Sequence, residues 1–165
     1  MNRWRLSAVT MAAGACALGA SPCAAAGRAT YQMPVSVNPV AGCTISAAPL
    51  VFALPVPVNA NVDSTSLITV RCTPFTAYVI DIDNGLHPQG NNRRVHNVSA
   101  NDYMTYDVYK DPPRSQVWGK GNLKNVSGNS GLLGIVAYPI YGRLNARATA
   151  KSGAYTDTLT ITVTF

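Results

Sequence analysis

Apolar and polar residues alternate in short runs along most of this 165-residue chain. Runs with this period of two predict β-strands, and the prolines and glycines between them predict turns. A helical spacing of apolar residues is nearly absent, so the pattern indicates an all-β sandwich or barrel. The expected strands are 43–47 continued by 50–52, 65–72, 76–82, 103–109, 117–118, 135–144 and 155–165.

Three segments between these strands have the composition of loops. Residues 54–61 are rich in proline, residues 86–101 are polar, and residues 119–131 are rich in Gly, Asn and Ser. The Asn84-Gly85 pair predicts a hairpin turn after the strand at 76–82. The chain shows no internal repeat and no second domain, so we expect one sandwich domain over residues 43–165.

An extra alternating segment precedes this domain, over residues 29–37, and a linker at 38–42 follows it. The last strand ends on the final residue, and a seven-strand sandwich needs a partner beside its last strand. An unfilled gap would leave backbone groups and a core face open. The N-terminal strand could fill this gap in its own chain or in a neighbouring copy, and periodicity alone does not separate the two. Its apolar face consists of Ala29, Tyr31, Met33, Val35 and Val37.

Residues 1–26 have the pattern of a secretory signal peptide. Arg3 and Arg5 precede an uncharged run of small and apolar residues, and Ala24-Ala25-Ala26 resembles a cleavage site before Gly27. The apolar run is shorter than the roughly 20 residues that a membrane-spanning helix needs. We therefore expect an exported mature chain that begins at Gly27.

Cleavage there would remove Cys16 and Cys23 and leave Cys43 and Cys72. An even pair of cysteines in an exported chain predicts a disulfide, with two free buried thiols as the alternative. A metal site would need more ligands at a suitable spacing.

The composition argues against several functions. The formal net charge is +6, but the basic residues are scattered, which indicates a solvated surface rather than a nucleic-acid site. His87 and His96 lie in a polar segment without a placed nucleophile or orienting acid, so we expect no catalysis. The Asp81-x-Asp83-Asn84-Gly85 run lacks the spacing of a calcium loop. No cofactor is expected.

An ordered set of short motifs resembles the spore coat protein U domain family and covers residues 43–165. After Phe52 the chain has Ala53-Leu-Pro-Val-Pro-Val58 in place of the family's Gly and aromatic residue, and the 119–133 loop diverges, so the subunit type stays open. The motifs are Cys43-Thr-Ile-Ser, Pro49-Leu-Val-Phe52, Leu67-Ile-Thr-Val-Arg-Cys72, Asp81-Ile-Asp-Asn-Gly-Leu86, Arg93-Arg94, Asp102-Tyr-Met-Thr-Tyr-Asp-Val-Tyr109, Val117-Trp118-Gly119, Tyr141-Gly-Arg143 and Gly153-Ala-Tyr-Thr-Asp-Thr-Leu-Thr-Ile-Thr-Val-Thr-Phe165.

The resemblance implies an incomplete immunoglobulin-like β-sandwich with an N-terminal donor strand. The family includes spore-coat proteins and pilin subunits of archaic chaperone–usher pili. In those pili a periplasmic chaperone holds the subunit, and an outer-membrane usher exchanges the chaperone for the N-terminal strand of the next subunit. The resemblance implies that residues 29–37 are the donor strand. The acceptor groove and chaperone-binding strand would include Leu159, Ile161, Val163 and Phe165.

The leading hypothesis is therefore a pilus or fimbrial subunit. It would be exported through the periplasm to the cell surface and would support adhesion or biofilm formation. Its partners would be copies of itself or related pilins, a periplasmic chaperone and an outer-membrane usher. Two alternatives stay open: a spore-coat or matrix protein of the same fold, and a monomeric secreted binding module. Trp118 is expected in the core, and Tyr155 as a structural tyrosine corner.

Overall fold

The computed structural model describes residues 27–53 and 58–165. The signal peptide expected at residues 1–26 lies outside the described residues, as does part of the proline-rich loop, 54–57. The chain divides after Val37 into an N-terminal segment and a compact unit, which are treated separately below. The described part of the N-terminal segment, 27–37, contains no strand, and its side chains are exposed.

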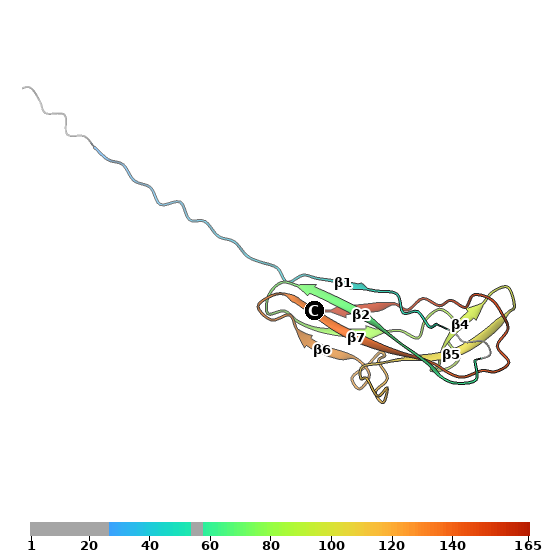
Figure 1. The fold of residues 1–165 in the computed structure, drawn as a ribbon. Coiled ribbons are helices and arrows are strands. Elements are labelled where there is room, and N and C mark those ends of the chain that lie inside the picture. Colours follow the sequence, from blue (N-terminus) through green and yellow to red (C-terminus); the bar gives the residue numbers. More distant parts are fainter. Residues whose placement is uncertain (1–26, 54–57) are drawn as a thin grey trace, which may run out of the picture. The chain divides into compact units, whose positions relative to one another are not determined.

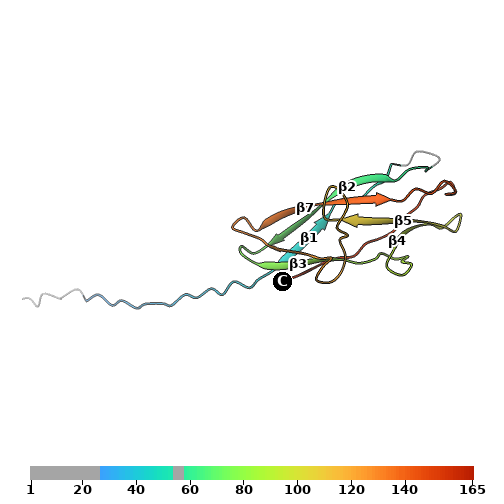
Figure 2. The same cartoon turned by 90° about the horizontal axis from the view of Figure 1, so that it is seen from below.

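The described part of the compact unit contains eight strands in two antiparallel sheets and no helix (Figure 1 and Figure 2). Over the described residues there is accordingly no helix of the length and apolarity that crossing a membrane requires. The all-β prediction is confirmed. One sheet has the order β1-β2-β7-β5-β4 and the other β6-β3-β8. The strands are β1 (Cys43–Ala47), β2 (Val62–Cys72), β3 (Ala77–Ile82), β4 (Arg93–Asn97), β5 (Asp102–Tyr109), β6 (Val126–Asn129), β7 (Ile135–Leu144) and β8 (Ile161–Thr164).

The core forms because alternate residues of facing strands point to the same side. Ile80 and Val108 are fully buried, as the period-2 pattern predicts. Each large apolar side chain of this kind contributes roughly 1.5–3 kcal/mol through burial. Trp118 also lies in the core, as expected. The buried apolar residues are Val58, Ile68, Val70, Tyr78, Ile80, Ile82, Met104, Tyr106, Val108, Trp118, Ile140 and Leu144.

A disulfide joins Cys43 to Cys72, which confirms the predicted pair. The two cysteines face each other in the β1–β2 register, so the bond fastens the first residue of β1 to the last residue of β2. The bond closes a loop with a sequence separation of 29. It fixes the strand at the edge of the larger sheet.

Two strands lie in segments that we expected to be loops. β4 interrupts the polar segment 86–101, and β6 interrupts the 119–131 segment. β4 was missed because its residues are mostly polar, although Arg93 and Asn97 at its ends are buried. β6 was missed because its segment is rich in Gly, Asn and Ser. The missing side chain of Gly128 leaves room for the Tyr138 hydroxyl and the Tyr78 ring, and the two tyrosine hydroxyls lie 3.0 Å apart.

The Asn84-Gly85 turn is not a hairpin, because the strands before and after it belong to different sheets. The Asp83 side chain organises this turn. Its Oδ1 accepts hydrogen bonds from the backbone N–H groups of Gly85 at 3.0 Å and Thr160 at 2.9 Å.

The last strand is also shorter than predicted, because it changes sheets. Thr156 forms two backbone hydrogen bonds with His96 of β4, at 2.9 and 3.0 Å, whereas β8 pairs with β3 of the other sheet. Residues 50–52, predicted to continue the first strand, form no strand, although Leu50 and Phe52 pack against the core.

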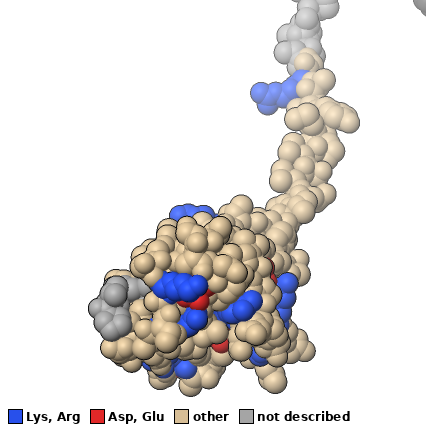
Figure 3. Space-filling view, turned by 90° about the vertical axis from the view of Figure 1, so that its right-hand side faces the viewer, with Lys and Arg blue, Asp and Glu red and all other residues tan. Residues whose placement is uncertain are grey.

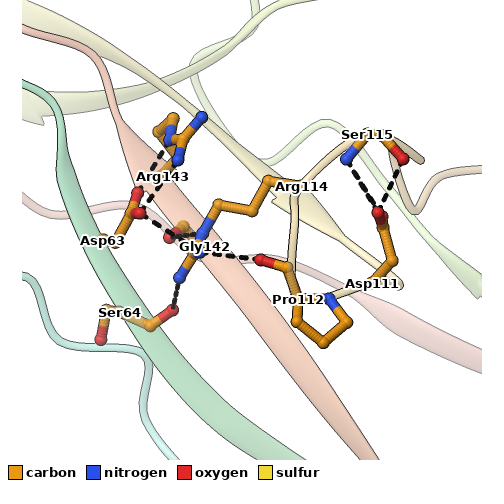
Figure 4. A network of polar contacts seen from close by, with 8 residues as sticks. All are labelled: Asp63, Ser64, Asp111, Pro112, Arg114, Ser115, Gly142 and Arg143. Atoms are coloured by element: carbon orange, nitrogen blue, oxygen red, sulfur yellow. Dashed lines mark hydrogen bonds and ion pairs between the residues drawn. The ribbon is translucent and has the colours of Figure 1, made fainter.

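A polar network on the larger sheet holds the 111–116 loop in place (Figure 4). Arg143 of β7 donates two hydrogen bonds to Asp63 of β2, at 2.8 and 2.9 Å, and holds the pKa of Asp63 below its ordinary value. Arg114 forms an ion pair with Asp63 at 3.2 Å and donates to the Gly142 carbonyl at 3.1 Å. These charged side chains therefore pair with one another and stabilise the fold.

Candidate functional site

An open edge beside β8 is the main irregularity of the sandwich. Among the described residues, β8 pairs only with β3, and β1 pairs only with β2. β1 and β8 are near one another but share no strand pairing in the described part of the chain. We call these two unpaired strand edges, together with the cavity beside them, the edge groove. Its half-buried apolar side chains are Ile45, Ile161 and Val163 on the two strands and Leu50, Phe52 and Leu159 at the cavity.

The cavity of the edge groove has a volume of about 510 Å³ and lies where the chain passes from its contact with β4 to β8. Phe52 stands on one side with its ring edge toward Tyr106, at a centroid distance of 6.2 Å. A cavity of this size has room for several apolar side chains. It is lined by Leu50, Val51, Phe52, Val95, Met104, Tyr106, Leu144, Gly153, Ala154, Tyr155, Thr156, Asp157 and Leu159.

Asp157 fixes one wall of this cavity. Its Oδ2 accepts a hydrogen bond from the Tyr106 hydroxyl at 2.7 Å, and its Oδ1 accepts one from the Leu86 N–H at 2.9 Å. Burial, together with the bond to Asp157, raises the pKa of Tyr106. A side chain at Gly85 would collide with this carboxylate, since a Cβ there would lie 2.0 Å from Asp157 Oδ2. The crossing segment is therefore held by polar contacts.

Tyr155 anchors the start of the same segment. Its hydroxyl donates to Asp102 Oδ2 at 2.6 Å and lies 2.9 Å from the Lys151 carbonyl oxygen, four residues upstream. This geometry is that of the expected tyrosine corner. The bond from Tyr155 is the main reason that the pKa of Asp102 is strongly lowered, and an ion pair with Arg147 at 2.7 Å adds to it.

The residues expected in the acceptor groove lie at and just before β8. Leu159 lines the cavity, Ile161 and Val163 are half-buried against the core, and Phe165 is 55 % exposed. The groove residues that the sequence did not reveal are those of the opposite wall, including Leu50 and Phe52. Their alternation after Pro49 was the available signal, but it was assigned to a strand.

The expected donor face is exposed in the described N-terminal segment. Tyr31 is 92 % exposed and Met33, Val35 and Val37 are 77 %, 78 % and 80 % exposed. The strand pairings of the described chain include no residue of this segment. Large apolar side chains are rarely left in water in such a row.

The two histidines belong to a cluster of aromatic and basic side chains. The His96 ring stacks on Tyr103 at a centroid distance of 4.3 Å, with Arg94 also 4.3 Å from the Tyr103 ring centre. His87 contacts His96 edge-on at 4.8 Å. Over residues 27–53 and 58–165, no three His, Cys, Asp or Glu side chains gather as a metal site would require.

The basic side chains do not merge into one surface on the face of the compact unit that Figure 3 shows. They lie in several separate places, and acidic side chains stand beside some of them. Several arginines form ion pairs with aspartates, of which only Arg93 is fully buried: Arg93 with Asp107, Arg114 and Arg143 with Asp63, and Arg147 with Asp102. This arrangement matches a solvated surface better than a phosphate-binding one.

Comparisons with known proteins agree with the fold. The chain is 32 % identical to "Protein U" of Myxococcus xanthus in an alignment of 186 positions that covers all of both chains. A chain in the crystal structure of the CsuC–CsuE chaperone–tip adhesion subunit pre-assembly complex, from archaic chaperone–usher Csu pili of Acinetobacter baumannii, superposes with a TM-score of 0.60 at 24 % identity. That match covers 76 % of this chain but only 40 % of the other chain, and it shows an immunoglobulin-like sandwich fold.

The family model of the Spore Coat Protein U domain matches residues 29–162, which include the exposed donor-face residues, the cavity and all strands up to the second residue of β8. The chain belongs to the Spore Coat Protein U domain family.

Proposed function

We propose that this protein is an exported structural subunit that assembles into a surface fibre by strand donation. Residues 29–37 of one copy would lie in the edge groove of the next copy. The free edge of β8, with half-buried core residues beside it, carries this proposal. A donated strand would pair with the backbone of β8 and place alternate side chains in the groove.

The burial of apolar side chains supports the insertion of the donated strand into the groove. Four of the five donor-face residues are large apolar side chains with exposures of 77–92 %. Each would contribute roughly 1.5–3 kcal/mol when it leaves water. Backbone hydrogen bonds along β8 would add register and direction. Pro34 cannot donate one of them, so pairing should be weakest in the middle of the donated strand.

The positions of the two ends of the groove suggest the strand direction. β1 begins where Gly42 O accepts a hydrogen bond from Thr73 N–H at 2.9 Å, and β8 ends nearby, since Thr164 pairs with Val79 of β3. The cavity lies at the other end of the groove. In a head-to-tail fibre of equally oriented copies, a strand leaving one copy beside Gly42 enters the next copy at its cavity. It then runs antiparallel to β8.

The partners follow from this proposal. A subunit with an open groove needs protection before assembly, which a periplasmic chaperone would supply, and an outer-membrane usher would catalyse the exchange. In the similar Csu structure, a chaperone and a tip adhesion subunit form a pre-assembly complex of this kind. The fibre would serve surface adhesion or biofilm formation, with no cofactor.

The test is a pair of charge substitutions on opposite faces of the donor strand. Val35→Asp places a charge in the apolar groove and should strongly reduce polymer yield. Ser36→Asp adds the same charge to the other face and should leave polymer yield nearly unchanged. Equal yields from the two variants would contradict the proposed face, and continued polymerisation after deletion of residues 27–40 would refute strand donation.

A spore-coat or matrix assembly is the second candidate. The family to which the chain belongs, and the full-length match to Protein U, favour it. The same strand donation would then build a layer instead of a fibre. Electron microscopy of the assembled wild-type protein distinguishes filaments from sheets.

A further inference from the structure

An exposed apolar cluster lies at the end of the sandwich where β1 begins. Phe75 is 67 % exposed, Leu132 71 %, Leu133 83 % and Ile135 49 %. We call these four residues the pole patch. None of them belongs to the core or lines the edge groove. Because so many large apolar side chains gather at one place, the patch indicates an interaction surface.

Two loops hold the pole patch in a fixed arrangement. The Phe75 N–H donates to Gly131 O at 2.9 Å, and Asn129 Nδ2 donates to Phe75 O at 3.1 Å. The Ser130 hydroxyl donates to Thr73 O at 2.7 Å. Phe75 has a φ of 60°, a left-handed conformation that is unusual for a bulky residue. The fold thus presents an aromatic ring outward on a costly backbone conformation.

The pole patch adjoins the start of the sandwich. Thr73 N–H binds Gly42 O at 2.9 Å, and Cys72 N–H binds Gly134 O at 2.8 Å. The patch therefore begins within a few residues of the point where the chain enters β1. Because of this proximity, a molecule that binds the N-terminal segment would lie close to the pole patch.

We infer that the pole patch is the contact between the bodies of successive copies in the fibre, an inference that rests on the proposed function. Only residues 38–42 separate Val37, the last donor-face residue, from Cys43. Five residues span at most roughly 18 Å, at about 3.3–3.6 Å each. The copy that holds the donated strand is thereby kept close to the patch.

The opposite end of the sandwich offers a matching surface. Val51, Leu86 and Val98 are 69 %, 66 % and 76 % exposed. Val51 lines the cavity, and Leu86 is bonded to Asp157 beside it. In the head-to-tail arrangement, this cavity end of the accepting copy faces the pole patch of the donating copy. An apolar surface thus meets an apolar surface at the point where the linker enters.

A cysteine-protection experiment on purified fibres tests the contact. In the folded mature chain, the disulfide occupies Cys43 and Cys72, so Leu133→Cys adds a single free thiol for maleimide. Leu123→Cys is the matched control, because Leu123 is 92 % exposed and lies outside the patch. We expect Leu133→Cys to lose most of its labelling in intact fibres and to regain it on denaturation, while Leu123→Cys is labelled throughout. Equal labelling in intact fibres would overturn the inference.

Fibre stiffness gives an independent measurement. Fibres of Leu132→Asp should still form through the donated strand but should bend more, with a shorter persistence length in electron micrographs than wild-type or Leu123→Asp fibres. An unchanged persistence length would refute the copy-to-copy contact. The patch would instead bind an outside surface if the Leu133→Cys thiol stayed accessible in fibres and if wild-type fibres bound hydrophobic beads but Leu132→Asp fibres did not. Failure of the wild-type protein to form fibres would instead refute the proposed function.

Discussion

Arg93 offers the sharpest test of how the two sheets are held together. Its side chain is 1 % exposed although it lies on the edge strand β4. Its guanidinium donates to Asp107 Oδ1 of β5 and to the carbonyl oxygens of Asp83 at 2.9 Å, Ile82 at 3.3 Å and Trp118 at 2.7 Å. One buried cation therefore connects the larger sheet to the end of β3 in the smaller sheet.

Replacing Arg93 by Met keeps a long apolar stem but leaves these acceptors without their donor. Removing one partner of a buried ion pair costs about 3–5 kcal/mol. The Asp107 side chain is 27 % exposed, so water can solvate part of its charge, which favours the lower end of that range. We therefore expect Arg93→Met to lower the free energy of unfolding by about 3 kcal/mol, a large share of the roughly 5–15 kcal/mol typical of a domain.

The measurement is urea unfolding followed by circular dichroism, with Arg71→Met as the control. Arg71 is exposed on β2, and its loss should cost less than about 0.5 kcal/mol. The double variant Arg93→Met/Asp107→Leu should be more stable than the sum of the two single losses predicts, because the two residues interact directly. Similar unfolding midpoints for Arg93→Met and Arg71→Met would refute the reasoning.

Three further predictions follow from the described contacts. Opening the disulfide with a reductant should destabilise the sandwich by about 3–4 kcal/mol, read as a lower urea midpoint. The hydrogen bond from Tyr155 lowers the pKa of Asp102 in the folded state. Ionised Asp102 therefore stabilises the fold above its ordinary pKa of 3.8, and this stabilisation is lost as the pH falls below that value. Asp102→Asn should flatten this acid dependence of the free energy of unfolding. Gly134→Ala should destabilise more than Gly90→Ala in thermal unfolding. Both glycines have a positive φ, but only at Gly134 would a Cβ meet backbone, 2.4 Å from Cys72 O.

The sequence pattern predicted the strands whose alternation is apolar. β2, β3, β5 and β7 bury one face each, and an alternating face buried against a partner is what the period-2 rule detects. The cysteine pair was also predictable, since few partners were available. β4 was not predictable in this way, because its buried groups are Arg93 and Asn97, which donate hydrogen bonds to carbonyl oxygens of distant segments.

The edge groove could be predicted only on one side. The apolar positions of the last strand, from Leu159 to Val163, were visible in the alternation with threonine. The change of sheet between Thr156 and β8 was not visible, because it depends on the Asp83 and Asp157 side chains binding backbone groups of residues far away in sequence. The scattered basic residues indicated that their side chains lie in solvent. Arg93 is an exception, because its side chain is buried, and its burial depends on contacts between distant segments.

The change of sheet and the cavity have a common cause. The crossing segment is bound to β4 through Thr156, to Leu86 and Tyr106 through Asp157, and to Asp83 through Thr160. These bonds fix the floor and one wall of the groove from the side of β3 and β4. The other edge of β8 is left without a strand partner in the described chain. Under the proposed strand donation, a groove held in this way would already be shaped before the strand entered, and preorganisation reduces the entropic cost of binding. The polar side chains that end the pairing of the last strand with β4 would therefore also preorganise the open edge of β8 for a donated strand.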